Sequence, residues 1–183
     1  MSGLRLLACA PTAALRAGRF GGDEDIDEGG RRAALAMSPP GRGDLWVCAP
    51  SRAARETAQA LGHSAITAPE LADPDFGRWD GLSLDDVSAG DAKGLQQWLT
   101  DPRSAPHGGE SLARVRQRAG SWLDAMARQR VVVVAHPIVV RAALCHALAL
   151  PDEAVWNLEV APLSLTRLTY RTGHWRLHFP AAG

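Results

Sequence analysis

The sequence predicts an α/β fold in which helices cover both faces of a mostly parallel central sheet. Short apolar segments at residues 4–8, 45–48 and 131–134 alternate with helical segments, as in strands joined by helical crossovers. The last segment is a run of valines, and a continuous β-branched run indicates a strand buried on both faces. The length of 183 residues suits one domain, so we expect a single three-layer α/β/α sandwich over residues 1–183.

The first half of the chain is expected to supply three strands and two helices. In order, these are a strand at 4–8, a helix at 28–37, a strand at 45–48, a helix at 52–61 and a strand at 65–67. Gly62 is a typical helix stop signal. Residues 70–81 contain Pro74, Gly77 and Gly81 and are expected to form a loop.

The second half is expected to be mainly helical, with a final hairpin. The longest apolar face at helical spacing predicts a helix at 111–128, and Pro137 is typical of a first helical turn. The expected elements are a short helix capped by Ser83, helices at 90–100 and 111–128, a strand at 131–134, a helix at 138–148, and strands at 163–170 and 174–179 around Thr172-Gly173.

Composition restricts the partners. Lys and Arg balance Asp and Glu, 20 against 20, which argues against binding a nucleic-acid backbone or an anionic membrane. No apolar run reaches the length of a membrane span. Three cysteines fit no disulfide framework, so a reducing, cytoplasmic location is expected. The histidines are too dispersed to suggest a metal site, and no cofactor is expected.

Candidate site residues follow predicted strands, where ligands gather in open α/β sheets. His136 ends one strand and opens a helix, which suits contact with an anion, although it could equally be satisfied by the backbone. Cys9 ends another strand and could be a nucleophile, although a small buried thiol is the commoner case. Asp73 lies in the loop at 70–81, where a raised pKa would allow it to act as a general acid.

The spacing around Cys9 argues against a cysteine phosphatase. Those enzymes resemble one another in a Cys-x5-Arg loop, and in this chain the arginine position falls on Leu15.

In this order, the segments resemble the histidine phosphatase superfamily, which has the phosphoglycerate mutase-like fold. Residues 75–81, Asp-Phe-Gly-Arg-Trp-Asp-Gly, are similar to the family's Asp-Phe-Gly-x-Trp-Glu-Gly. Residues 16–20 and 108–111 match two further stretches, and residues 134–136 followed by Arg141 resemble the second histidine motif. The whole is most similar to small bacterial members related to α-ribazole phosphatase.

The resemblance implies a phosphohistidine enzyme, but the nucleophile motif departs from the family pattern. In the family, a histidine attacks phosphorus, arginines hold the phosphoryl oxygens and a carboxylic acid protonates the leaving oxygen. Here Cys9 takes the place of that histidine, while Ala8 and Ala53 take the places of the arginines. Leu15 stands where many members have a phosphate-binding asparagine. The catalytic candidates that remain are His136, Asp73 and Cys9, with Thr12, Arg16, Arg19 and Arg52 as candidates for substrate binding.

Three hypotheses follow. The first is a degenerate member that no longer forms phosphohistidine and binds a small phosphorylated molecule or a partner in the altered cleft. The second is an active phosphomonoesterase that uses Cys9 or His136, with Asp73 as general acid. The third is a structural or interaction protein whose cleft is closed.

Overall fold

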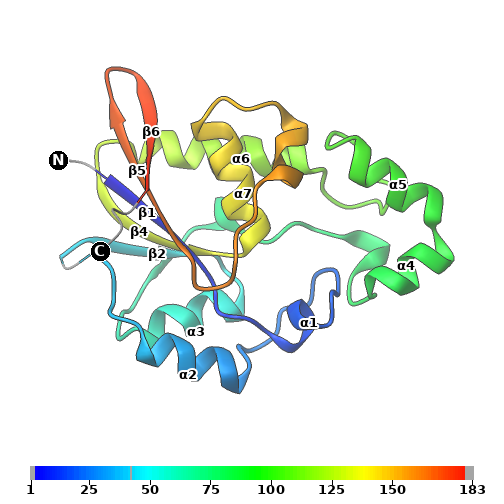
Figure 1. Cartoon of the computed structure of the whole chain (residues 1–183), viewed down its shortest axis with the longest axis horizontal. Helices are drawn as coiled ribbons and strands as arrows, with labels where there is room; N and C mark the ends of the chain where they lie inside the picture. The colour runs from blue at the N-terminus through cyan, green and yellow to red at the C-terminus, as the bar shows by residue number, and fades with distance from the viewer. Residues whose placement is uncertain (1–2, 42, 180–183) are drawn as a thin grey trace.

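The computed structural model describes residues 3–41 and 43–179 and is built around a six-stranded sheet of order β3-β2-β4-β1-β5-β6 (Figure 1). The strands are β1 (Gly3–Ala8), β2 (Leu45–Cys48), β3 (Ile66–Thr67), β4 (Arg130–Ala135), β5 (Leu165–Arg171) and β6 (His174–His178). β1 to β4 pair in parallel, whereas β5 and β6 are antiparallel to their neighbours. The predicted α/β class with a mostly parallel sheet is therefore confirmed.

Helices lie on both faces of the sheet. In Figure 1, α2 and α3 lie on one side, α6 and α7 on the other, and α4 and α5 project beyond the sheet. The helices are α1 (Ala13–Arg16), α2 (Glu28–Ala36), α3 (Arg52–Ala60), α4 (Leu84–Gly90), α5 (Ala92–Thr100), α6 (Leu112–Ala125) and α7 (Pro137–Ala147), with 3-10 turns η1 (Pro69–Leu71), η2 (Gly77–Trp79) and η3 (Asp152–Asn157). Within residues 3–41 and 43–179, none of them is long and apolar enough to cross a membrane.

The valine run forms the centre of the sheet. Val131 to Val134 are each at most 1% exposed, because β4 lies between β1 and β2 and both of its faces carry helices. Ala135 pairs with Ala8, and Val134 with Cys48, so the carboxyl ends of three parallel strands meet at one edge. Cys9, Ala49 and His136 are the next residues along these strands, and the site is built there.

Local signals explain most helix boundaries. Ser83 and Asp86 form a reciprocal capping box at the start of α4. The helix expected at 90–100 begins later, since Gly90 ends α4 and the Asp91 side chain caps α5. The four-residue helix α1 was not expected, because its only strong signal is Thr12, whose hydroxyl oxygen accepts from the Leu15 N–H at 3.1 Å.

Candidate active site

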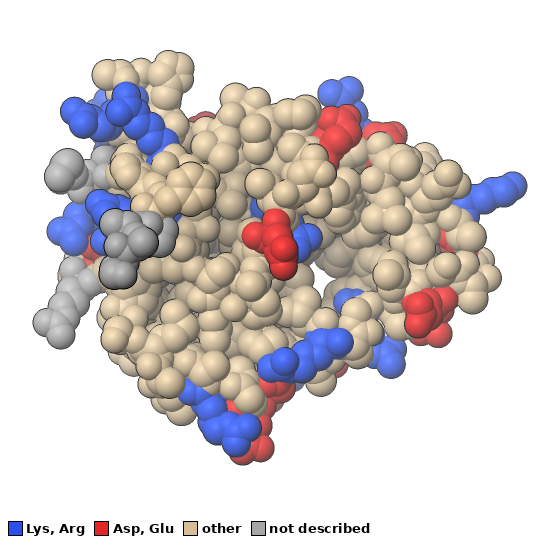
Figure 2. Space-filling view, in the orientation of Figure 1, with Lys and Arg blue, Asp and Glu red and all other residues tan. Residues whose placement is uncertain are grey.

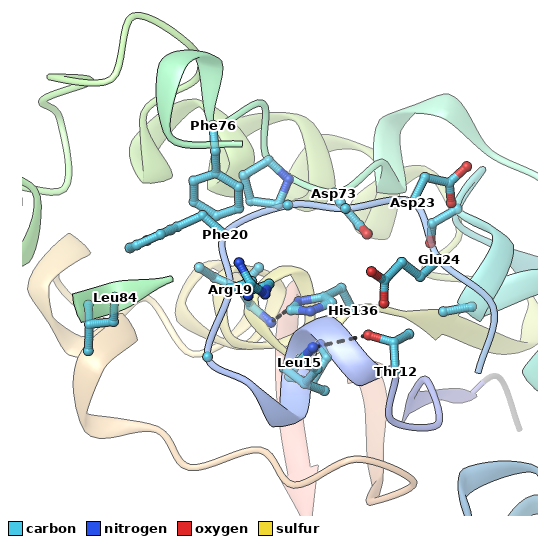
Figure 3. A pocket seen from close by; sticks show the side chains of 18 of the residues that line it. Thr12, Leu15, Arg19, Phe20, Asp23, Glu24, Asp73, Phe76, Leu84 and His136 are labelled. Carbon is cyan, nitrogen blue, oxygen red and sulfur yellow. Dashed lines mark hydrogen bonds between the residues drawn. The ribbon is translucent and has the colours of Figure 1, made fainter. Parts of the chain in front are cut away.

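A pocket of about 380 Å³ opens beside the carboxyl edge of the parallel strands (Figure 3). Figure 2 shows acidic and basic side chains scattered around a hollow on this face of the molecule, without a large patch of one sign. The polar lining includes His136, Asp73, Thr12 and Arg19, which the sequence singled out, together with Asp23, Glu24 and Arg141. The apolar lining includes Leu15, Phe20, Phe76, Leu84, Trp98 and Trp156.

His136 is fixed at the junction of β4 and α7. It is the N-cap of α7, and its Nδ1 accepts the Ile138 N–H at 3.3 Å. Burial, and then the nearby Arg141 guanidinium, lowers the imidazole pKa to about 4. The ring is therefore neutral near pH 7, with Nδ1 as acceptor and Nε2 carrying the proton.

Asp73 lies in the loop between η1 and η2. Burial, and then the Asp23 charge, raises its pKa to about 6, and Arg118 acts in the opposite direction. Arg118 also ties this loop to α6, because it donates to the Asp73 carbonyl at 3.4 Å and pairs with Glu110 at 2.8 Å. A side-chain hydrogen bond with Ser51 also lowers the Asp73 pKa.

Cys9 lies outside the pocket lining. It is 1% exposed, and its backbone N–H donates to the Ala135 carbonyl at 2.8 Å. Burial, together with the Asp73 carboxylate, raises the thiol pKa to about 12. A thiol in this state is almost fully protonated at neutral pH, which argues against Cys9 as a nucleophile.

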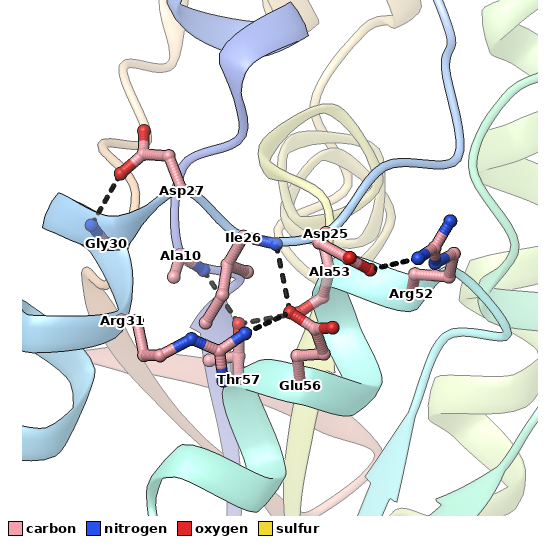
Figure 4. Close-up of polar contacts among 10 residues, drawn as sticks. All are labelled: Ala10, Asp25, Ile26, Asp27, Gly30, Arg31, Arg52, Ala53, Glu56 and Thr57. Atoms are coloured by element: carbon pink, nitrogen blue, oxygen red, sulfur yellow. Dashed lines mark hydrogen bonds and ion pairs between the residues drawn. The ribbon is translucent and has the colours of Figure 1, made fainter.

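Of the three arginines predicted to bind substrate, one lines the pocket and two do not. Arg19 lines the pocket and donates to the Gly81 carbonyl at 2.9 Å. Arg16 instead pairs with Asp27. Arg52 pairs with Asp25 at 2.5 Å, as Figure 4 shows. The pocket lining includes neither Arg16 nor Arg52, because each guanidinium is held by a carboxylate of the acidic loop at residues 23–28.

The positions that depart from the family pattern are apolar in the structure as well. Ala53 and Leu15 line the pocket, and Ala8 is fully buried. Thr57 follows Ala53 in α3, and its hydroxyl donates to the Ala53 carbonyl at 2.6 Å while accepting the Ala10 N–H at 2.9 Å (Figure 4). These bonds tie the start of α3 to the end of β1 without supplying a cation.

Asp23 and Glu24 line the pocket and were missed by sequence reasoning, whereas Arg141 was noted only as part of the second histidine motif. Asp23 and Glu24 belong to the acidic loop, where nothing in the sequence distinguishes pocket residues from solvated ones. The Asp23 carboxylate accepts the Arg52 N–H at 2.6 Å, and the Glu24 carboxylate accepts the Ala14 N–H at 2.9 Å. The first turns of α3 and α1 therefore hold these two side chains in position. Arg141 follows His136 by five residues on α7, and this spacing was the signal available for it.

Comparison with known proteins gives the family. The family model described as histidine phosphatase superfamily (branch 1) matches residues 10–182. This chain belongs to the histidine phosphatase superfamily. The resemblance seen in the motifs is therefore confirmed at the level of the superfamily.

Individual relatives agree with the family. Phosphoserine phosphatase 1 of Hydrogenobacter thermophilus is 29% identical over 154 residues, covering 76% of this chain and 73% of that protein. The structure of a mycobacterial glucosyl-3-phosphoglycerate phosphatase in complex with VO3 is 28% identical, with a TM-score of 0.82 and coverage of 97% and 98%. The α-ribazole phosphatase of Shigella flexneri shares the fold, with 21% identity, a TM-score of 0.83 and coverage of 96% and 94%.

Proposed function

We propose that this chain is a degenerate histidine phosphatase that forms no phosphohistidine and uses its pocket to bind a ligand. The observation that carries the proposal is the lining of the pocket where the family places its phosphoryl-binding arginines and nucleophile. Ala53 and Leu15 line that part of the pocket, and Cys9 lies buried beside it as a protonated thiol. The pocket is open, which argues against a purely structural role with a closed cleft.

Electrostatics support the loss of the family's chemistry. A phosphoryl group carries about two negative charges near neutral pH. Each missing charged contact is expected to cost roughly 2–4 kcal/mol of transition-state stabilisation, by analogy with the removal of oxyanion-site donors. Two such contacts and the nucleophile are missing at once, so most of the rate is expected to be lost.

A small phosphorylated molecule remains a candidate ligand. The relatives named above are phosphatases, and a phosphate reaching Arg19 and Arg141 would meet two guanidinium groups at the pocket wall.

A second candidate function is hydrolysis centred on His136. It is favoured by the position of His136 and Asp73 on the same pocket, with a neutral imidazole and a carboxyl group that is half protonated near pH 6. In this case His136 would act as nucleophile or base, and Asp73 would protonate the leaving oxygen.

The test is hydrolysis of phenyl phosphate and phosphoserine between pH 4.5 and 8, with His136→Ala and Cys9→Ala measured in parallel. We expect no release of phosphate above that of a heat-denatured control. Turnover that is lost only in His136→Ala would establish the second function and overturn the first. Turnover that is lost in both variants would show that the thiol takes part despite its burial.

A further inference from the structure

The β5–β6 hairpin carries basic side chains on one of its two faces. Residues that pair directly across neighbouring strands point to the same face of a sheet. The register of β5 and β6 therefore places five exposed side chains on one face, which we call the basic face: Arg167, Arg171, His174, Arg176 and His178. Residues 160–179 contain no aspartate or glutamate, so the hairpin itself supplies no counter-charge.

The opposite face of the hairpin packs against the molecule. Leu168 is fully buried, and the rings of Tyr170 and Trp175 meet at 5.1 Å. The indole N–H of Trp175 donates to the Asp124 carboxylate of α6 at 2.8 Å. In Figure 1, the helices on the other side of the sheet, α2 and α3, lie away from the hairpin. The basic face is therefore left to solvent.

The arginines of the basic face are not neutralised within the described part of the chain. There, no ion pair involves Arg167, Arg171 or Arg176. Arg5, which pairs in register with Arg167 from β1, is by contrast held by the buried Asp44 carboxylate. In Figure 2, basic side chains gather at the upper left, where Figure 1 draws the hairpin. Neighbouring like charges on a sheet are unfavourable, so an anionic partner would stabilise this face.

The same hairpin ends the sheet with an open strand edge. The Ala8 N–H donates to the Ser164 carbonyl, and the Leu163 N–H donates to the Ala8 carbonyl, both at 3.0 Å. Since Ser164 faces β1, every second residue after it also faces β1, and the residues between them bond to β6. The basic-face residues of β6 therefore turn their backbone groups toward β5. Trp175 and Leu177 turn their N–H and C=O groups toward the open edge.

These two features together identify the kind of partner. An open strand edge binds an extended polypeptide, whose backbone supplies matching N–H and C=O groups. Side chains of an added strand alternate between faces, so every second one would lie over the basic face and the others beside Trp175 and Leu177. Phe179 follows β6 and is 83% exposed, which adds apolar surface at that end. A nucleic acid or an anionic membrane would use the charges and leave the backbone groups unpaired.

A second copy of this chain is a poor occupant of the edge. Two β6 strands that paired with each other would bring their basic faces together, and charged side chains on edge strands are a common device against such association. The charges that exclude another β6 favour a strand of opposite charge.

We propose that β6 binds an extended acidic segment of a partner protein by strand addition, with acidic side chains over the basic face and apolar side chains beside Trp175 and Leu177. This site is independent of the pocket and of its proposed function, because none of the residues of β6 lines the pocket. Its binding specificity would come from alternation of acidic and apolar residues in the partner.

The test is fluorescence anisotropy at pH 7.5 with a labelled short peptide in which glutamate and valine alternate. We expect it to bind at least about tenfold more tightly than a peptide of the same composition in shuffled order, or one with lysine in place of glutamate. No binding of the alternating peptide or equal binding of the shuffled one would overturn the proposal. Stronger binding of an oligothymidylate or of phosphatidylserine vesicles would also overturn it and identify a polyanion surface instead.

Hydrogen exchange tests the pairing of the backbone. Binding of the alternating peptide is expected to slow exchange of the Trp175 and Leu177 amides, which face the open edge. The Arg176 amide is an internal control, since it already faces β5. Binding without added protection at Trp175 and Leu177 would show a purely electrostatic contact and contradict strand addition.

Charge reversal locates the acidic side chains. Arg176→Glu is expected to weaken binding of the glutamate–valine peptide about tenfold and to strengthen binding of the lysine–valine peptide. Arg114→Glu is the matched control, because Arg114 is an exposed arginine of α6 that lies outside the hairpin. Circular dichroism confirms folding, and Arg171→Glu replaces Arg176→Glu if that variant folds poorly. An equal loss of affinity in Arg114→Glu would show a general charge effect and contradict the assignment.

Discussion

At the scale of single residues, Asp73 and His136 are linked to pH in opposite directions. The folded state raises the pKa of Asp73 from 3.8 to about 6 and lowers that of His136 from 6.5 to about 4. Ionised Asp73 therefore costs stability at neutral pH, and this cost disappears as the pH falls through 6 toward 3.8. The His136 contribution is present above pH 6.5 and is lost as the pH falls toward 4.

Asp73→Asn separates the two effects. At pH 7.5 the variant is expected to be more stable than the native chain by at most about 3 kcal/mol, because it removes a buried charge. This advantage should vanish below about pH 3.8, where Asp73 is mostly protonated in both states. Urea denaturation at several pH values measures it. An Asp73→Asn variant that is less stable than the native chain at pH 7.5 would show that the carboxylate is held by a favourable partner.

His136→Asn keeps a side chain that can cap α7. Its stability should rise relative to that of the native chain as the pH falls from 6.5 to 4, in the same urea denaturation series.

Site residues could be predicted from the sequence where a motif places them at the end of a strand or in a recognisable loop. His136, Asp73 and Thr12 were predicted as site residues and all line the pocket. For Arg16 and Arg52 the prediction could not anticipate their partners, because an ion pair between residues 11 or more positions apart depends on how the acidic loop folds. Their roles in binding stay predictions, without support from the pocket lining.

At the scale of elements, the loop that carries Asp73 depends on close backbone packing. Glu110 N–H donates to the Asp75 carbonyl at 2.7 Å, and Arg78 N–H donates to the His107 carbonyl at 3.0 Å. A Cβ on Gly109 would lie 2.1 Å from the Asp75 oxygen, which no side chain tolerates. The two loops therefore approach each other at a distance that only glycine permits.

Gly109→Ala is expected to destabilise the fold by about 1–3 kcal/mol, since the backbone itself must move to accept the methyl group. Thermal denaturation measures the loss of stability. Gly90→Ala is the matched control, because a Cβ at the end of α4 meets nothing within 4 Å. Comparable losses in the two variants would contradict the role of the close approach.

Elements with strong local signals were predictable, and short ones were not. A valine run predicts β4, and a long apolar face predicts α6. β4 extends one residue beyond the predicted range at each end, and α6 lies within its predicted range. α1 and η3 were not predicted, since a single turn of helix has almost no periodicity in sequence and is stabilised by its surroundings. The pocket acids Asp23 and Glu24 were missed because their contacts with the starts of α3 and α1 depend on how the loop at residues 23–28 folds.

At the scale of the whole molecule, the fold and the site chemistry depend on different residues. The sheet is stabilised by buried apolar side chains such as Val133 and Leu7, which the strand and helix pattern of the sequence already predicts. The pocket lies at the carboxyl edge, where Ala53 is part of its lining and Cys9 lies buried outside that lining. The architecture could therefore be predicted from the sequence, whereas the pairing of charges around the pocket could not.

Because the fold and the site chemistry depend on different residues, the residues that the family resemblance implies at positions 53 and 9 can be restored without disturbing the sheet. Ala53→Arg places a cation in the pocket lining at the start of α3, so it should raise the affinity for phenyl phosphate by about tenfold while the sheet stays folded. Cys9→His alone should give no hydrolysis, because the arginines that the family resemblance places at positions 8 and 53 are still missing. Together, the two substitutions are expected to give hydrolysis at least about 30-fold faster than Cys9→His alone, which corresponds to roughly 2 kcal/mol from one restored charged contact. Phosphate release from folded variants measures the difference. A Cys9→His variant as active as the pair would show that the nucleophile alone was missing and that the remaining cations, Arg19 and Arg141, suffice.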